Sequence, residues 1–348
     1  MKKNIIIIDD SALMRRVLSD IINETEQYHV AATAHNGEEG MKLMRSMSSI
    51  HLVFLDMNMP KMGGLEVLHQ MKKENLSIPV VVFSAAMDRD SAETIEALSI
   101  GALDFVRKPE NILVNVENFR RKIREVFALL EHEPEEMSVV VKAKPRSRTS
   151  SAGSLGRGKL VALACSTGGP KALQDVIPFL PKNLDAPMLI VQHMPEGFTE
   201  SLAHRLDDMS MITVKEAADG DVLENGKVYL AKGGFHMRVV YERGHHVIRL
   251  GTDAPVGRLR PYANYMYESL VQSNYNEIIC VVLTGMGADG TKGIETLSQE
   301  KNIYVISQDK PTCVVYGMPK AIAESGLTDE ILPLNKIAQA ITKKTGVC

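Results

Sequence analysis

Several residue types and patterns that would point to particular partners are scarce in this 348-residue chain. It has no Trp, aromatic residues make up 5%, and the net charge is only -3, from 40 Lys and Arg against 43 Asp and Glu. Such a balanced charge offers no broad basic field for DNA or for an anionic membrane. We therefore expect no nucleic-acid partner.

Cysteines and long apolar runs are also scarce. The four cysteines, Cys165, Cys280, Cys313 and Cys348, lie too far apart for a CxxC pair or a zinc knuckle. The longest apolar runs, such as residues 78–86, are much shorter than a membrane span, and the N-terminus has no signal-peptide pattern. We expect a cytoplasmic protein that does not insert into the membrane.

The composition changes sharply once, between about Glu131 and Lys159. An acidic patch there leads into KAKPRSRTSSAGSLGRGK, a basic, Ser- and Gly-rich stretch without apolar periodicity. This composition is typical of a linker rather than of a loop inside a compact domain. The chain is also about twice as long as a common domain. We predict two domains, 1–125 and 158–348, joined by a linker over 126–157.

Both halves alternate short β-branched runs with amphipathic helical stretches. This alternation is typical of α/β domains built on a doubly wound parallel sheet. In the second half, Lys227 to Leu230 and Met237 to Leu250 predict antiparallel strands, forming an edge hairpin on that sheet. The other predicted strands cover 4–8, 28–33, 51–55, 78–83 and 102–106 in the first half, and 159–164, 188–192, 278–283 and 303–307 in the second.

Polar residues follow several predicted strands of the first domain, where a parallel sheet binds its ligands. Carboxylates gathered at strand ends suit Mg²⁺, and a nearby ammonium and hydroxyl can bind a phosphoryl group. Asp56 would then be the nucleophile that takes the phosphoryl. One Asp after a strand is more often a turn former or a helix cap. The prediction therefore depends on the whole set, which is Asp9, Asp10, Asp56, Ser84 and Lys108.

These residues, within the strings DD, LDMNMPKMGG, SA and KP, resemble the receiver domain of two-component response regulators over about residues 1–125. The resemblance implies a flavodoxin-like fold, with Asp56 phosphorylated by a chemotaxis histidine kinase. It also implies Mg²⁺ binding by Asp9, Asp10, Asp56 and the Asn58 carbonyl, phosphoryl binding by Ser84 and Lys108, and an aromatic switch at Phe105. This aromatic side chain is equally compatible with ordinary core packing.

In the second domain, the predicted strand 159–164 runs directly into CSTGGP. Glycines and a proline at a helix start leave backbone N–H groups free to bind an anion. Ser166 is therefore a helix cap, part of a phosphate cradle, or a nucleophile whose oxyanion these amides stabilise. The string lacks the lysine of GxxxxGK[ST], which disfavours nucleotide phosphates, and it is not GxSxG.

Two further motifs follow predicted strands of this domain. His193 stands in VQHMP and Asp289 in TGMGADG. If the strands are neighbours, Asp289 can orient His193 as a base for Ser166, although a lone histidine there is more often structural. The glycines of TGMGADG also spell GxGxxG, with Asp309 at the ribose-acid spacing. A carboxylate beside a pyrophosphate without an intervening basic residue disfavours dinucleotide binding.

Taken together, STGGP, QHMP, TGMGADG and QDKPTCVVYGMPKA resemble the catalytic domain of chemotaxis protein-glutamate methylesterases over about residues 157–346. A receiver followed by this domain is the family's arrangement, and the resemblance implies a Rossmann-like catalytic domain. It implies Ser166 as nucleophile, His193 as general base, Asp289 as its orienting partner, and the Met286 amide and Thr167 as oxyanion donors.

Two positions depart from the family pattern. Cys165 precedes the serine where a small residue is expected, and it is either inert filler or a site of oxidative inhibition. Tyr262, Ala263 and Asn264 stand where we expect Ser-Val-Asp, so the family's substrate contacts do not transfer to these positions.

The predicted activity is hydrolysis of glutamate γ-methyl esters on the cytoplasmic helices of chemoreceptors, together with deamidation of receptor glutamines. No cofactor is expected for the esterase reaction. We expect the unphosphorylated receiver to cover Ser166 and phosphorylation of Asp56 to expose it. Two alternatives stay open, namely an inactive, phosphorylation-dependent protein that docks on receptors, and an esterase acting on a non-receptor methylated protein.

Overall fold

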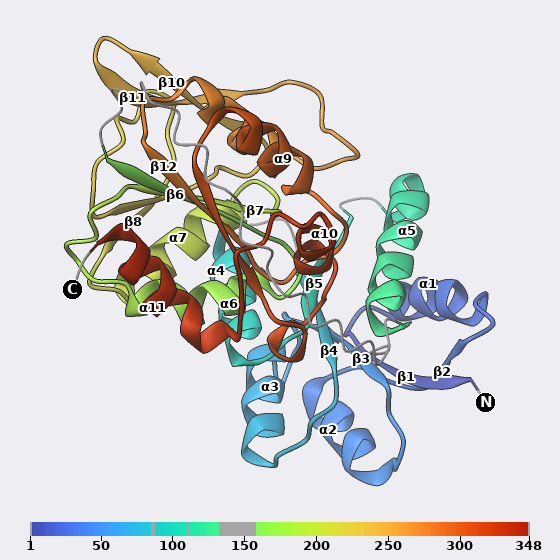
Figure 1. The fold of residues 1–348 in the computed structure, drawn as a ribbon. Coiled ribbons are helices and arrows are strands. Elements are labelled where there is room, and N and C mark those ends of the chain that lie inside the picture. The colour runs from blue at the N-terminus through green and yellow to red at the C-terminus, as the bar shows by residue number, and fades with distance from the viewer. Residues whose placement is uncertain (1, 85–87, 110–111, 132–157, 347–348) are drawn as a thin grey trace. The chain divides into compact units, whose positions relative to one another are not determined.

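The computed structural model describes residues 2–84, 88–109, 112–131 and 158–346. The chain divides into two compact units, Met1–Glu135 and Glu136–Cys348, each with its own parallel sheet (Figure 1). Most of the predicted linker lies outside the described residues, and its first part, 126–131, belongs to helix α5. The predicted domain boundaries stay predictions. None of the described helices is long and apolar enough to cross a membrane.

The first unit is a five-stranded sheet in the order β2-β1-β3-β4-β5, with every pair parallel. This is the flavodoxin-like order. Strands β1, β3 and β4 are almost wholly buried, as expected for strands covered by helices on both faces. The elements are β1 Lys3–Ile8, α1 Ala12–Asn23, β2 Tyr28–Ala34, α2 Gly37–Ser46, β3 Leu52–Asp56, α3 Gly64–Lys73, β4 Val80–Ser84, α4 Asp88–Ile100, β5 Asp104–Arg107 and α5 Ile112–Glu131.

The second unit has a seven-stranded parallel sheet in the order β14-β13-β12-β6-β7-β9-β8. The predicted α/β class is therefore confirmed. The strands are β6 Lys159–Cys165, β7 Met188–Gln192, β8 Thr213–Glu216, β9 Lys227–Leu230, β10 His236–Glu242, β11 His245–Gly251, β12 Glu277–Val282, β13 Ile303–Gln308 and β14 Glu330–Leu332. The helices are α6 Gly169–Val176, η1 Ile177–Phe179, α7 Phe198–Asp208, α8 Ala263–Ser269, η2 Leu270–Gln272, α9 Thr291–Glu300, η3 Lys310–Thr312, α10 Met318–Glu324 and α11 Leu334–Thr345.

Two details of the predicted second sheet were wrong. Strand β9 is parallel to both of its neighbours, β7 and β8, and lies inside the sheet rather than in an antiparallel hairpin. The antiparallel hairpin predicted over 237–250 is confirmed, because β10 pairs with β11, but this pair forms a separate two-stranded sheet rather than an edge of the parallel sheet. The sequence of a four-residue strand does not indicate whether the strand runs parallel or antiparallel to its neighbours. That depends on the strands with which it pairs. Strands β8 and β14 were not predicted at all.

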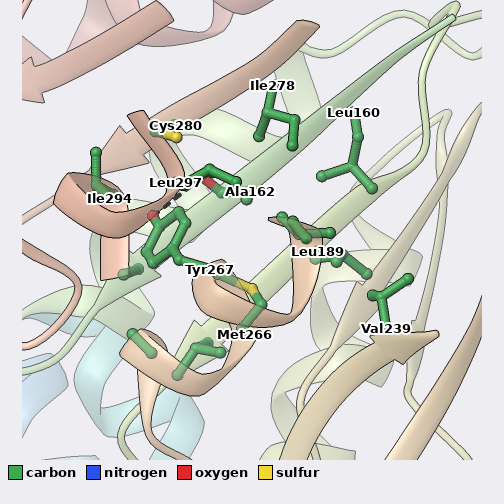
Figure 2. Packing of buried hydrophobic residues seen from close by; sticks show 14 of the residues in the cluster. Leu160, Ala162, Leu189, Val239, Met266, Tyr267, Ile278, Cys280, Ile294 and Leu297 are labelled. Carbon is green, nitrogen blue, oxygen red and sulfur yellow. Dashed lines mark hydrogen bonds between the residues drawn. The ribbon is translucent and has the colours of Figure 1, made fainter. Parts of the chain in front are cut away.

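A buried tyrosine ties helix α8 to the centre of the second sheet (Figure 2). The Tyr267 hydroxyl, fully buried, donates toward the carbonyl oxygens of Ala162 and Val281 at 3.1 and 3.2 Å. These carbonyls belong to β6 and β12, the adjacent strands that lead into the CSTGGP and TGMGADG motifs. The core therefore holds the starting points of both motifs together.

Candidate functional site

The three motifs of the second unit meet at one edge of its sheet. The strand order reverses between β6 and β12, and β7 lies on the other side of β6. Ligands of open α/β sheets bind outside the carboxyl ends of the strands at such a reversal. Ser166 follows β6, His193 follows β7, and the loop 283–290 follows β12. The fold thus brings together residues that lie more than a hundred positions apart.

Ser166 and His193 are the first residues after two paired strands. The last pair in the β6–β7 register is Cys165 with Gln192, and the His193 amide donates to the Cys165 carbonyl at 3.2 Å. Neighbouring strands lie about 5 Å apart, so the two side chains leave adjacent positions. In the described part of the chain, no hydrogen bond joins the Ser166 hydroxyl to His193.

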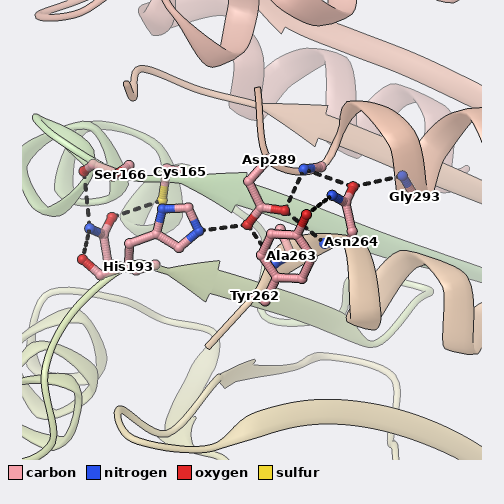
Figure 3. Close-up of polar contacts among 10 residues, drawn as sticks. Cys165, Ser166, His193, Tyr262, Ala263, Asn264, Asp289 and Gly293 are labelled. Carbon is pink, nitrogen blue, oxygen red and sulfur yellow. Dashed lines mark hydrogen bonds and ion pairs between the residues drawn. The ribbon is translucent and has the colours of Figure 1, made fainter. Parts of the chain in front are cut away.

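His193 is bonded to Asp289 (Figure 3), with 2.7 Å between its Nε2 and the carboxylate Oδ2. Both side chains are almost buried, at 8% and 4% exposure. The carboxylate also accepts backbone N–H groups, at Oδ2 from Ala263 (2.7 Å) and at Oδ1 from Asn264 (3.0 Å) and Gly290 (2.8 Å). Because Asp289 acts only as an acceptor, Nε2 carries the ring proton and Nδ1 keeps its lone pair. Nδ1 is thereby the nitrogen of this ring that can accept a proton.

The two residues predicted as oxyanion donors, Met286 and Thr167, lie in the segments that follow β12 and β6. The Met286 amide donates to no acceptor among the described residues, so it is open to a substrate oxygen. The Thr167 carbonyl accepts a hydrogen bond from the Thr284 hydroxyl at 3.0 Å. The turn then passes through Gly168, at the left-handed φ of 76° that glycine tolerates, into helix α6.

Gln192 is a site residue that the sequence reasoning missed. Its buried amide nitrogen donates to the carbonyls of Ser166 and His193 at 3.0 and 3.3 Å. Its oxygen accepts from the Cys165 thiol at 3.0 Å, and a Cβ on Gly169 would lie only 1.9 Å from that oxygen. The signal was present, because Gln192 is a polar residue at the end of a buried strand.

Cys165 is fully buried behind the serine. Burial raises the pKa of its thiol, so little reactive thiolate forms. The structure therefore favours the inert-filler interpretation over a site of oxidative inhibition.

Asn264, one of the departures from the family pattern, faces the start of helix α9 rather than the substrate side. Its buried side-chain oxygen accepts from the amides of Gly290 and Gly293 at 3.0 and 2.6 Å. Its nitrogen donates to the Tyr262 hydroxyl at 2.7 Å. Asn264 therefore caps α9 from another helix and supports the segment that carries Asp289 (Figure 3).

The predicted phosphorylation site gathers at the strand ends of the first unit. Asp9 follows β1, while Asp56 and Ser84 are the last residues of β3 and β4; all three are buried, and Asp10 is exposed. Carboxylate oxygens of Asp9, Asp10 and Asp56 lie within 4.8 Å of one another, a spacing that fits a small divalent cation. The Lys108 ammonium lies 2.9 Å from Asp9 Oδ2 and 2.7 Å from Asp56 Oδ2.

The remaining predicted residues lie around this cluster. The exposed Asn58 donates its backbone amide to Asp56 Oδ1 at 3.4 Å, at the long end for a hydrogen bond. Phe105 is half-buried on β5, next to the strand that carries Ser84.

Comparison with known proteins finds a family model for each of the two units. The family model described as CheB methylesterase matches residues 161–341, and the model described as response regulator receiver domain matches residues 5–117. The chain belongs to the CheB methylesterase family. The matches cover both sites described above.

Relatives in the CheB methylesterase family match the chain over nearly its whole length. A protein of Oceanobacillus iheyensis is 39% identical, with 99% of both chains covered, and one of Bacillus subtilis is 38% identical, with 97% of both covered. Both are named protein-glutamate methylesterase/protein-glutamine glutaminase. The crystal structure of the Thermotoga maritima CheB methylesterase catalytic domain is 43% identical with a TM-score of 0.52, covering 54% of this chain and 99% of that one.

In this member of the CheB methylesterase family, the ionised forms of the buried receiver carboxylates Asp9 and Asp56 are destabilised. Burial and the neighbouring Asp9 raise the pKa of Asp56 from 3.8 to about 6, although the Lys108 ammonium opposes the rise. Burial also raises the pKa of Asp9, again against Lys108. Holding two ionised carboxylates in one buried cluster therefore costs the folded state free energy at neutral pH.

Replacing Asp56 by asparagine should therefore stabilise the receiver unit near neutral pH. We expect a gain of about 1–2 kcal/mol, or roughly 3–8 °C in the melting temperature, in metal-free buffer. Because protonation relieves the same cost, the gain should shrink as the pH falls below about 6 and vanish near the ordinary pKa of 3.8. Calorimetry across this pH range measures it.

The matched control for this measurement is Asp20→Asn. Asp20 forms an exposed ion pair with Arg16, and losing such a pair changes stability by about 0.5 kcal/mol or less. A neutral-pH loss of stability in Asp56→Asn would show that the Lys108 contact outweighs burial and repulsion.

Proposed function

We propose that this chain is a phosphorylation-activated serine hydrolase that removes methyl groups from glutamate γ-methyl esters of chemoreceptors and deamidates receptor glutamines. The observation that carries the proposal is the hydrogen bond of 2.7 Å between His193 and Asp289, with Ser166 as the first residue after the neighbouring strand β6. The names of relatives matched over almost their full length support the same activity. No observation favours an inactive docking protein or a non-receptor substrate.

In the proposed reaction, the Ser166 hydroxyl attacks the γ-carbonyl carbon while its proton passes to Nδ1 of His193. The Met286 amide and Thr167 donate to the oxyanion of the tetrahedral intermediate. The imidazolium, stabilised by Asp289, returns the proton to the departing methoxide, and methanol leaves. Water then attacks the acyl-enzyme by the same proton transfers, which releases the glutamate carboxylate and the serine.

Deamidation of glutamine uses the same groups but is the harder reaction. The amide nitrogen is a poorer leaving group than methoxide, so it must receive the proton from His193 before the C–N bond breaks. Ammonia then leaves, and water resolves the same acyl-enzyme.

In the receiver unit, Asp56 would accept the phosphoryl group from a histidine kinase. The contacts of Lys108 with Asp9 and Asp56 support its role as the cation that neutralises the phosphoryl oxygens, with Ser84 as hydroxyl donor. Asp9, Asp10, Asp56 and the Asn58 carbonyl would hold Mg²⁺, which supplies positive charge for phosphoryl transfer when bound.

The test is methanol release from membranes that carry methyl-labelled chemoreceptors. The full chain should release methanol, and faster after treatment with Mg²⁺ and a small phosphodonor. Asp56→Asn should keep the basal rate and lose the stimulation. Absence of methanol release above the membrane background, with or without the phosphodonor, would favour the docking alternative.

A further inference from the structure

Two buried polar side chains lie beside the turn formed by residues 166–168, which we call the serine turn. They are on the side of this turn opposite to Gln192. Thr284 and Gln308 are 1% and 0% exposed. Thr284 lies two residues after β12, Gln308 is the last residue of β13, and neither takes part in the proposed reaction. Buried polar groups persist where each finds its partners, so their partners indicate what they do.

Thr284 holds the serine turn at two peptide groups, which lie on either side of the Ser166–Thr167 peptide. Its carbonyl accepts the Ser166 amide at 3.0 Å, and its hydroxyl lies 3.0 Å from the Thr167 carbonyl oxygen. The hydroxyl also accepts the Val315 amide at 2.9 Å, so its single proton is directed to Thr167, the nearer of two carbonyls. Every polar atom of Thr284 except its amide thus contacts the turn or the loop beside it.

Gln308 keeps Thr284 in place. Its side-chain oxygen accepts the Thr284 amide at 2.8 Å, while its nitrogen donates to the Thr312 carbonyl at 2.7 Å. Because one partner is a donor and the other an acceptor, they define which end of the Gln308 amide group is oxygen and which is nitrogen. Thr284 is therefore held from β13 and has little freedom to follow a movement of the turn.

The Thr167 carbonyl matters because peptide groups are planar. A rotation of that carbonyl rotates the Gly168 N–H with it and shifts the Cα of Thr167, to which Ser166 is joined. The Gly168 amide donates to no acceptor within the described residues, so the N–H side of this peptide adds no bond that resists the rotation. The Thr284 hydroxyl contacts the carbonyl of this peptide and resists its rotation.

We propose that Thr284 is a positioning residue, whose hydroxyl orients the Ser166–Thr167 turn for attack without touching the substrate. The inference rests on the proposed function, because it concerns the serine that the hydrolysis uses. A purely structural role would require only that the buried hydroxyl be satisfied, and its loss would then lower stability but leave turnover by the folded protein intact.

The test compares Thr284→Val, which keeps the shape and removes the hydroxyl, with Thr284→Ser, which keeps the hydroxyl. Thr284→Val should lower kcat about 10- to 100-fold, the scale of a small misplacement of a reacting group, with KM within about twofold. Thr284→Ser should retain most of kcat. The rate of Ser166 labelling by a fluorophosphonate should follow kcat in both variants.

The matched control is Thr328→Val, which removes another buried hydroxyl, one that bonds the end of a helix. Its Oγ1 donates to the Ile322 carbonyl at 3.1 Å at the far end of helix α10. This variant should lose thermal stability like Thr284→Val but keep kcat and the labelling rate of the parent. If Thr284→Val does not fold, Thr284→Ala replaces it in the same comparison.

Three results would separate the inference from the proposed function. Unchanged kcat and labelling in Thr284→Val or Thr284→Ala, with lowered stability, would overturn the positioning role. A parent that labels at Ser166 but releases no methanol would overturn the proposed substrate, and the labelling rates would still decide the role of Thr284. A parent that does not label would overturn both.

Discussion

Ser166→Ala should lower methyl-ester hydrolysis by about four to six orders of magnitude, the usual loss when a catalytic nucleophile is removed. The substitution removes the hydroxyl that would form the acyl-enzyme, and the preceding Cys165 cannot replace it because it is buried with its thiol directed to Gln192. The amides that stabilise the oxyanion stay in place, which leaves a small residual rate.

The measurement for Ser166→Ala is methanol release at saturating labelled receptor, together with circular dichroism. The serine makes no side-chain hydrogen bond within the described residues, so the variant should fold like the parent. Ser298→Ala on helix α9 is the control, because its hydroxyl bonds only the Glu295 carbonyl. A folded Ser166→Ala protein with activity within tenfold of the parent would remove the serine from the mechanism.

Asp289→Asn should lower kcat about 10³- to 10⁴-fold with a much smaller change in KM. In the parent protein, the Asp289 carboxylate accepts four hydrogen bonds, from the His193 ring and from three backbone amides. An asparagine that keeps its oxygen toward Asn264 and Gly290 turns its NH₂ group toward His193 and Ala263. The ring must then accept at Nε2, which moves its proton to Nδ1, the nitrogen needed as the base.

Asp289→Asn also places the asparagine NH₂ group, a donor, against the N–H donor of Ala263. The free energy of unfolding should therefore fall by about 1–3 kcal/mol. Steady-state kinetics on the folded variant separates the two effects, and the exposed Asp175→Asn, which loses only an ion pair with Lys171, is the control. A loss of less than tenfold in kcat would mean that Asp289 holds the loop rather than the base.

The sites were predictable because their residues share one signal, a polar side chain at the end of a buried apolar strand. In the sequence, this signal indicates Asp9, Asp56, Ser166 and His193. It is equally present at Gln192, Thr284 and Gln308, but no reaction step requires them, so the sequence alone does not single them out. Residues that support a site carry the same pattern as residues that react, and only their contacts separate the two.

Other features had no local signal. Asn264 lies 25 residues before Asp289, and nothing near it in sequence indicates that it caps helix α9 at Gly290 and Gly293. The direction of β9 likewise depends on β7 and β8, because a strand's pairing energy comes from its neighbours. The interpretation of Asn264 as a change in substrate contacts came from its family position alone.

For this protein, apolar periodicity and strand-end residues were enough to predict two α/β units, the candidate reacting groups and the edge of each sheet where they lie. Those properties are local, since each depends on a few neighbouring residues and on the rule that parallel strands end at one edge. Tertiary packing decided three other features. These are which nitrogen of His193 carries the proton, the low reactivity of the Cys165 thiol, and the hydrogen bond by which Thr284 holds the serine turn. Each depends on a hydrogen-bond partner or on burial supplied by another part of the chain.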